Sequence, residues 1–125
     1  MPTLIACLSS GKGTWTEVIK VIQAHPWDKI FLITDNFGKE KFMLKKDNLF
    51  FVTINPVPDT DVHHLKEQIV QELKGKIKDF EVALNFISGS GKEHMALLEA
   101  VLELGLNFRL ISVQDGQVDT LGLRR

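Results

Sequence analysis

The sequence predicts an α/β protein: a Rossmann-like three-layer sandwich with a mostly parallel sheet and a C-terminal antiparallel hairpin. Short apolar runs, typical of strands buried on both faces, alternate along the chain with segments whose apolar residues recur at helical spacing. This alternation favours parallel strands joined by helical crossovers. Near the end of the chain, Asp115-Gly116 separates two strand-like runs and predicts a tight hairpin turn.

Composition and charge indicate one compact domain, residues 1–125. Of the 125 residues, 44% are hydrophobic and 25% are charged, which provides enough apolar surface to bury a core. Fifteen lysines and arginines nearly balance sixteen aspartates and glutamates, so the formal net charge is -1. A chain without a basic field is unsuited to duplex DNA, and we expect no binding to it.

The compartment is predicted from cysteine usage and from the lengths of the apolar runs. Cys7 is the single cysteine, so no internal disulfide can form, and it lies in an apolar run typical of a buried strand. No run approaches the roughly 18 apolar residues of a membrane helix, and the N-terminus lacks the basic and apolar regions of a signal peptide. We therefore expect a cytoplasmic protein with no membrane partner.

In the first half of the chain, apolar runs alternate with two helix-like segments. The first helix is expected from Thr14 up to the His25-Pro26 pair, with Thr14 and Glu17 at capping-box spacing. Trp15 lies on its apolar face and is expected in the core. We expect strands at residues 3–8, 29–34 and 49–54, and a short second helix at residues 39–45.

A proline-rich connection at residues 55–59 precedes a third helix, expected from Val62 to about Lys76. His63 and His64 are adjacent in this helix, so they cannot share a helical face as a pair of metal ligands would. We expect both histidines on the surface. We also expect no metal and no cofactor in this protein.

The last helix and the strands around it complete the predicted sheet. The helix follows a strand at residues 82–87 and ends with Gly105 as its C′ residue. We expect the final strands at residues 108–113 and 117–121. The helical residues expected to face inward are Met95, Leu98, Val101 and Leu102.

The connection into the last helix is the candidate functional site. Ser88-Gly89-Ser90-Gly91 is a turn of small residues, and Lys92 follows in the first helical turn. Glycines permit a sharp turn, serine hydroxyls lie near unpaired helix N–H groups, and the helix dipole favours an anion. Together with Lys92 these features predict a phosphate site, which Glu93 would oppose if it faced the same way. A tight turn with a purely structural role is the alternative.

Two known phosphate-binding loops are absent from this turn. A Walker A loop requires glycine at the position of Phe86 and Ser or Thr at that of Glu93. The dinucleotide fingerprint G-x-G-x-x-G requires a third glycine where His94 stands, and it belongs after the first strand. The anion site is therefore predicted from local chemistry and not from a complete motif.

A second polar loop, residues 9–13, follows the first strand. In a flavodoxin-like strand order the first and fourth strands lie close together, so both loops reach the edge of the sheet where ligands bind. Asn36, after the second strand, is a candidate for contact with a base. Lys12 and His94 also have a plainer interpretation as surface residues. The predicted ligand-binding residues are Ser9, Gly11, Lys12, Gly13, Asn36, Ser88, Gly89, Ser90, Gly91, Glu93 and His94.

These two loops resemble those of the CRISPR-associated Rossmann fold, or CARF, domain. Ser9-Ser10-Gly11 matches a Ser/Thr and Gly loop after an N-terminal strand. Residues 88–95 match a Ser/Thr-Gly-Gly-Thr-Lys type of turn that leads into an Ala/Leu-rich helix. The chain departs from the family where Phe86 replaces a usual Asn and Ser90-Gly91 replaces Gly-Thr. The likeness covers nearly the whole chain, and we expect a stand-alone CARF-like protein.

The resemblance implies a homodimer that binds one cyclic oligoadenylate, the second messenger of type III CRISPR defence, across its two-fold axis. A ring with an even number of repeats matches such an axis. Some family members are ring nucleases that cleave this ligand without a metal, by attack of a ribose 2′-OH on its own phosphodiester. Lys92 and Ser10 match the positions expected to be catalytic.

Two other functions remain open on the sequence alone. The turn between the fourth strand and the last helix, together with the loop after the first strand, forms one corner of the predicted fold. The same corner suits a small α/β enzyme or binding protein that acts on a mononucleotide or phosphorylated metabolite, with one ligand per chain. The chain is also compatible with an interaction module that has no small ligand. Fold class does not decide between these functions.

Overall fold

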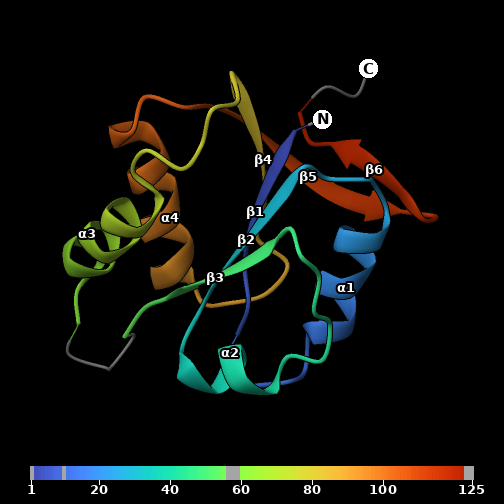
Figure 1. The fold of residues 1–125 in the computed structure, drawn as a ribbon, viewed down its shortest axis with the longest axis horizontal. Coiled ribbons are helices and arrows are strands. Elements are labelled where there is room, and N and C mark those ends of the chain that lie inside the picture. Colours follow the sequence, from blue (N-terminus) through green and yellow to red (C-terminus); the bar gives the residue numbers. More distant parts are fainter. Residues whose placement is uncertain (1, 10, 56–59, 123–125) are drawn as a thin grey trace.

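A mostly parallel sheet forms the centre of the molecule (Figure 1). The structure is a computed structural model and describes residues 2–9, 11–55 and 60–122. Within these residues the sheet has six strands in the order β3-β2-β1-β4-β5-β6. They are β1 (Thr3–Cys7), β2 (Lys29–Thr34), β3 (Leu49–Thr53), β4 (Glu81–Asn85), β5 (Asn107–Gln114) and β6 (Gln117–Thr120). The predicted α/β, Rossmann-like class is confirmed.

Helices cover both faces of the sheet, as a three-layer sandwich requires. They are α1 (Trp15–Gln23), α2 (Asn36–Lys41), α3 (Val62–Leu73) and α4 (Gly91–Glu103). Figure 1 shows α3 and α4 together on one face, α1 on the other, and α2 at the lower end of the sheet. All five residues of β1 are buried, because both of its faces are covered. Among the described residues, no helix is long and apolar enough to cross a membrane.

The strand order differs from the flavodoxin-like order that we expected. β1 pairs in parallel with β2 on one side and with β4 on the other, so Ile5 has both Phe31 and Leu84 as partners. The difference arises because the crossover through α3 carries the chain from the β3 edge past β1 to its other side. The order therefore reverses between β1 and β4, and such a switch point is where open α/β sheets bind ligands.

Each face of the sheet has its own hydrophobic cluster. On the face covered by α3 and α4, Ile5 and Leu84 pack in a cluster with the helix residues Leu65 and Leu97. On the face covered by α1, Trp15 packs with the strand residues whose side chains point to that face of the sheet. Trp15 is only 5% exposed, so its predicted place in the core is confirmed.

Two helices have different boundaries from those predicted. α2 spans Asn36–Lys41 instead of residues 39–45, because the Asp35 side chain caps it by accepting a hydrogen bond from the Gly38 N–H (2.9 Å). α3 ends at Leu73, before Lys76, and Gly75 then adopts a positive φ of 78°.

Helix α4 turns toward the core a stripe that overlaps only in part with the one predicted: Val101 is buried and Leu98 packs partly buried against the core, as expected. Met95 and Leu102 are each 62% exposed, so their inward placement was wrong. Alanines on the inner face let α4 approach α3 and the sheet closely, and the longer side chains on the other stripe then face solvent. The buried residues of α4 are Ala96, Leu97, Ala100 and Val101.

The predicted turns at the end of the chain are confirmed. Asp115 and Gly116 both have positive φ angles, 53° and 76°, as a type I′ hairpin turn requires. β6 pairs antiparallel with β5 in the resulting hairpin. Gly105, directly after the last turn of α4, has φ 71° and serves as its C′ residue.

Candidate functional site

The predicted corner lies where β1 and β4 end, at the switch point of the sheet. Because these strands are paired neighbours, the loop after Cys7 and the loop after Asn85 leave the same edge of the sheet side by side. The structure brings the two loops into direct contact through hydrogen bonds from Ser9 and Thr14 to Ser88. The corner is therefore a single unit built from distant parts of the chain.

The Ser88 hydroxyl holds these loops together. Its residue is only 1% exposed, and its Oγ accepts hydrogen bonds from the Ser9 N–H (2.8 Å) and from the Thr14 hydroxyl. Thr14 makes no side-chain capping bond to α1, so the predicted capping box with Glu17 was wrong. A buried hydroxyl that bridges two loops fixes their spacing, and Ser88 shapes the corner without facing solvent.

Gly89 and His94 form the tightest part of the turn. Gly89 has a φ of 95°, and a Cβ at this position would lie 2.9 Å from the Cβ of Cys7. His94 Nε2 is 2.7 Å from the Ser88 carbonyl oxygen, and its ring stacks on Phe86 with centroids 4.9 Å apart. A carbonyl only accepts hydrogen bonds, so Nε2 carries the proton and donates it. His94 therefore braces the turn, and only its Nδ1 is available for other chemistry.

A carboxylate already lies at the N-terminus of α4. Ser90 and Glu93 form a reciprocal capping box: Ser90 Oγ accepts from the Glu93 N–H (3.4 Å), and Glu93 Oε2 accepts from the Ser90 N–H (3.3 Å). This negative charge stands at the positive end of the helix dipole, where the sequence predicted a phosphate. An incoming anion must displace the Glu93 side chain or bind beside it.

The two lysines of the corner have different surroundings. Lys92 is half-buried, and its Nζ donates a hydrogen bond to the Thr60 carbonyl oxygen (2.8 Å), just before α3. Lys12 is exposed on the β1 loop, with its Nζ 6.0 Å from the centre of the Trp15 ring. That ring is fixed by its own hydrogen bond from Nε1 to the Ser9 carbonyl oxygen (3.0 Å). Lys12 thus provides an exposed ammonium group on the loop after β1.

Glycines leave the main chain of both loops open. A Cβ placed on Gly11, Gly13 or Gly91 would have no heavy atom within 4 Å. An open main chain allows a ligand to approach backbone N–H groups directly. Ser10, the other predicted catalytic residue, lies outside the described residues.

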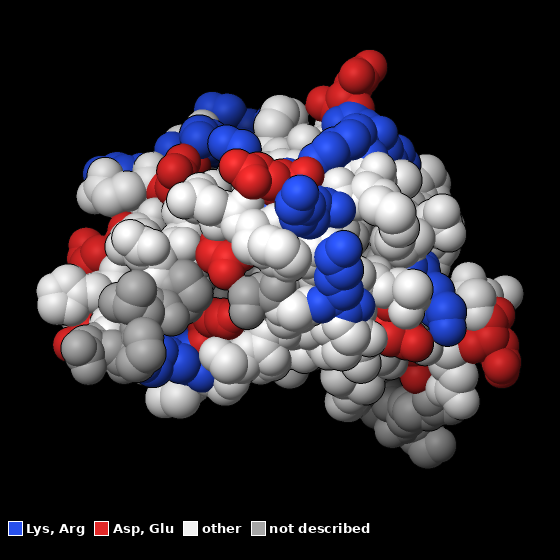
Figure 2. Space-filling model, turned by 90° about the horizontal axis from the view of Figure 1, so that it is seen from below, with Lys and Arg blue, Asp and Glu red and all other residues white. Residues whose placement is uncertain are grey.

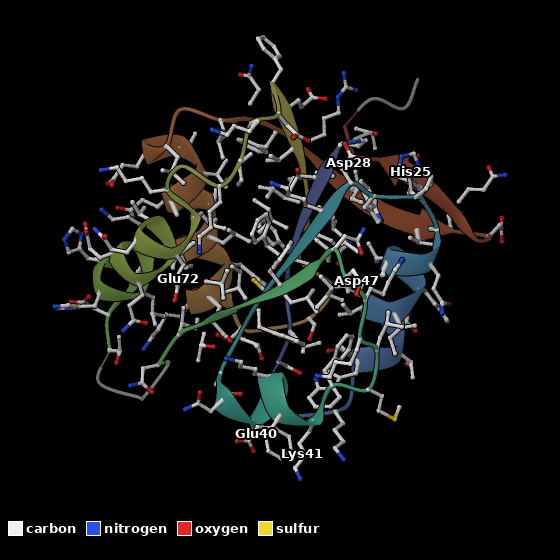
Figure 3. All side chains as sticks on the ribbon, in the orientation of Figure 1. His25, Asp28, Glu40, Lys41, Asp47 and Glu72 are labelled. Carbon is white, nitrogen blue, oxygen red and sulfur yellow. The ribbon has the colours of Figure 1, made fainter. Side chains whose placement is uncertain are left out.

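Asn36 lines a separate cleft, and no residue of the Ser88 turn lines this cleft. This cleft has a volume of about 510 Å³ and lies between the end of β3 and helix α3. Figure 3 shows Glu72, one of its lining residues, on α3. The lining is mostly amides and carboxylates: Asn36, Thr53, Ile54, Asn55, Glu67, Gln68, Gln71 and Glu72.

Charges of both signs are mixed on the end of the molecule that carries the corner. Figure 2 views that end from below, and Lys and Arg side chains lie among Asp and Glu side chains without forming one basic field. This mixture agrees with the formal net charge of -1. A surface of this kind suits a ligand that is held locally and not by a long-range field.

Sequence reasoning missed an ion-pair network between α3 and α4. Lys66 is 3% exposed, and its Nζ lies 2.6 Å from Glu103 Oε1 and 2.7 Å from Glu67 Oε1. The hydrogen bonds with Glu103 and then Glu67 raise the pKa of Lys66, and Lys66 in turn lowers the pKa of Glu67. A signal was present, because Lys66 stands one helical turn after Val62 on the apolar face of α3.

Cys7 and the histidines of α3 do not add a reactive centre. Burial, and secondly the charge of Glu93, raise the pKa of the Cys7 thiol, so it stays protonated. His63 and His64 are exposed on α3, as expected, with ring nitrogens 3.8 Å from Glu67 Oε1 and 2.9 Å from Asp61 Oδ1. Across residues 2–9, 11–55 and 60–122, no three His, Cys, Asp or Glu side chains gather as a metal site.

The structure defines this chain as a Rossmann-like α/β protein with a braced, glycine-rich corner at its topological switch point. No protein-family model matches the chain, and a search of curated proteins finds no match. A proposal for its function therefore rests on the residues of the corner themselves.

Proposed function

We propose that this protein binds a cyclic oligoadenylate across a homodimer, as a CARF-like sensor of type III CRISPR defence in the cytoplasm. The observation that carries the proposal is the direct pairing of β1 and β4, with the Ser88 hydroxyl joining their loops. Two loops that are fixed at a switch point form a preorganised surface. Such a surface binds a ligand without the entropy cost of ordering the loops.

The chemistry of this surface suits phosphates that approach the main chain. Gly11, Gly13 and Gly91 have no side chain in the way, and Lys12 supplies an exposed ammonium group beside them. Lys92 joins them when its long side chain leaves the Thr60 carbonyl. Each phosphate of the ring would then accept backbone hydrogen bonds and one charge-assisted bond.

An exposed apolar stripe beside the corner supports the dimer. Met95 and Leu102 lie two turns apart on one face of α4, and each is 62% exposed. Ile87, which precedes the Ser88 turn in the chain, is 50% exposed. Apolar side chains that gather on one face are typical of an interaction surface. A two-fold axis along this stripe would bury it and bring two copies of the turn around one ring.

The test is isothermal titration of the full chain with cyclic tetra-adenylate and cyclic hexa-adenylate. We expect one ring per two chains. Lys12→Ala and Lys92→Ala should each weaken binding by about tenfold, the loss of one charge-assisted bond. Lys20→Ala is the matched control, because Lys20 is paired with Glu17 on α1, outside both loops, and should leave binding unchanged. Failure of both rings to bind would contradict the proposal.

Chromatography of the same mixtures tests for cleavage. In that reaction the ribose 2′-oxygen forms a bond to phosphorus, the bond to the 5′-oxygen breaks, and the 2′-hydroxyl proton passes to the 5′-oxygen. The product is a linear oligoadenylate that ends in a 2′,3′-cyclic phosphate. Its appearance would make the protein a ring nuclease, and an unchanged ring would make it a sensor only.

The second candidate, a protein that binds one mononucleotide or phosphorylated metabolite per chain, was expected at the corner, and one separate cleft offers another place for the base. The cleft of about 510 Å³ beside α3 belongs to a single chain and presents amide groups from Asn36, Asn55 and Gln68. Glu67 and Glu72 also line it, so the phosphate of such a ligand would have to point out of the cleft. Amides of this kind pair with the edges of bases. Binding of AMP at one molecule per chain, with no binding of either ring, would establish this function instead.

A further inference from the structure

A separate groove lies at the opposite end of the strands from the corner. Its volume is about 380 Å³, and it is formed by the first residues of β2, the edge strand β3 and the connection between α3 and β4. None of the predicted site residues line it. The lining residues are Lys29, Phe31, Phe50, Phe51, Val52, Gly75, Lys76 and Lys78.

The floor of the groove is aromatic. Phe31 is 3% exposed, and the Phe50 ring stacks on it with centroids 5.5 Å apart and an angle of 30° between the planes. Phe50 itself is 44% exposed, because β3 is the edge strand of the sheet and no further strand lies beside it in the described residues. A half-exposed ring on a fixed, buried ring is a platform on which a third ring can stack.

The rim of the groove is basic. The charged residues that line it are all lysines, Lys29, Lys76 and Lys78. Lys29 Nζ donates to the Lys76 carbonyl oxygen (3.3 Å), and Lys76 Nζ lies 3.6 Å from Glu72 in an exposed pair. Lys78 has no ion-pair or hydrogen-bond partner for its Nζ among the described residues. A negative group in the groove would therefore gain attraction without meeting a carboxylate of the lining.

We propose that this groove binds a small planar aromatic molecule that carries an anionic group, such as an aryl carboxylate, sulfonate or phosphate. The ring stacks on Phe50, and the anion lies between Lys76 and Lys78. The volume of about 380 Å³ falls within the range of small-molecule sites. This groove shares no residue with the β1–β4 corner, so the outcome of its test is independent of the proposed function.

The test uses 1-naphthalenesulfonate as the probe, titrated into the isotopically labelled full chain and followed by NMR. We expect saturable shifts of the amide signals of residues 50–52 and 75–78. Two matched compounds separate the contributions: cyclohexanesulfonate has the charge without the aromatic ring, and 1-naphthalenemethanol has the ring without the charge. Each should bind about tenfold more weakly.

Variants locate the probe within the groove. Phe50→Ala should weaken binding by about tenfold, whereas Phe80→Ala, which removes a phenylalanine that is 87% exposed outside the groove, should not. The double variant Lys76→Gln/Lys78→Gln should weaken binding to a similar extent. Its control is Lys39→Gln/Lys41→Gln on α2, and Figure 3 shows Lys41 at the lower end of the molecule.

Three results would overturn this proposal. They are the absence of saturable shifts, shifts centred outside the groove, and equal losses in the test and control variants. Lys76 and Lys78 are exposed, so we expect their variants to keep the fold and to test the site even if Phe50→Ala alters β3.

Discussion

Gly89 is the residue on which the geometry of the corner depends most directly. It combines a φ of 95° with a close approach to Cys7, and an added methyl group would lie 2.9 Å from the Cβ of Cys7. We expect Gly89→Ala to lower the free energy of unfolding by about 2–3 kcal/mol, from backbone strain together with this contact. Urea denaturation followed by circular dichroism measures the change.

Two other glycines provide controls for this substitution. Gly91→Ala places its Cβ in open space and should change stability by no more than about 0.5 kcal/mol. Gly105→Ala has a positive φ of 71° but open space, so it reports strain alone, about 1 kcal/mol. Equal stabilities of the Gly89 and Gly91 variants would show that the turn does not require glycine for the reason given.

Ser88→Ala tests the bridge between the two loops. The substitution leaves the Ser9 N–H and the Thr14 hydroxyl without their shared acceptor, and we expect a loss of about 1–3 kcal/mol in urea denaturation. Thr14→Val in the same background completes a double-mutant cycle. If the two losses simply add, the hydroxyl–hydroxyl bond contributes nothing to stability.

At this scale the sequence predicted which residues meet, but not what each one does. Ser88 and Ser90 look alike in the sequence, yet Ser88 bridges two loops and Ser90 caps α4. The difference depends on Thr14, which comes from a distant part of the chain. Local propensity predicted a capping bond for Thr14, and the tertiary contact replaced it.

At the scale of elements, the Lys66 network links α3 to α4. It should make the stability of the protein depend on pH in both the acidic and the alkaline range. Lys66 lowers the pKa of Glu67 below its usual 4.5, so the stability from this pair is present above pH 4.5 and is lost as pH falls. Glu103 and Glu67 raise the pKa of Lys66 above its usual 10.5, so stability is present below pH 10.5 and is lost as pH rises further.

Lys66→Met should flatten this profile at both ends. Methionine keeps an apolar stem of similar length, so we expect stability at neutral pH to change little. Urea midpoints measured from acid to alkaline pH give the comparison. Lys20→Met is the control, because its pair with Glu17 is exposed and should leave the profile of the natural chain intact. An unchanged profile in Lys66→Met would contradict the assigned network.

The orientation of α4 shows what an amphipathic pattern does not determine. The helix has two apolar stripes, one with Met95 and Leu102 and one with Ala96, Leu97, Ala100 and Val101. Hydrophobicity alone favoured the larger side chains for the core. Close packing against α3 favoured the smaller ones, since alanine permits short distances between helices.

For the whole molecule, the alternation of apolar runs and helices was sufficient to predict the fold class. It was not sufficient to predict the strand order. The central strands β1, β2 and β4 are all continuous apolar runs, so their sequences do not say which of them are neighbours. Adjacency depends on the path of α3, and this path places both predicted loops at the switch point.

The exposed stripe of α4 leads to a prediction about assembly. If it forms a two-fold interface, Met95→Glu/Leu102→Glu should raise the dissociation constant of the dimer by about a hundredfold or more, because carboxylates would be buried without partners. Both side chains are 62% exposed in the single chain, so the fold should stay intact by circular dichroism. Sedimentation velocity over a range of concentrations measures the dimer.

Phe80→Glu controls for the loss of an exposed apolar side chain, since Phe80 is 87% exposed and directly precedes β4, outside α4. It should leave the dimer unchanged. If the site is shared by two chains, Met95→Glu/Leu102→Glu should abolish both dimer formation and binding of the cyclic adenylate. A site contained in one chain requires that binding persist in the monomer. A natural chain that sediments as a monomer at every concentration, with or without the ring, would rule out the shared site and favour a ligand bound by one chain.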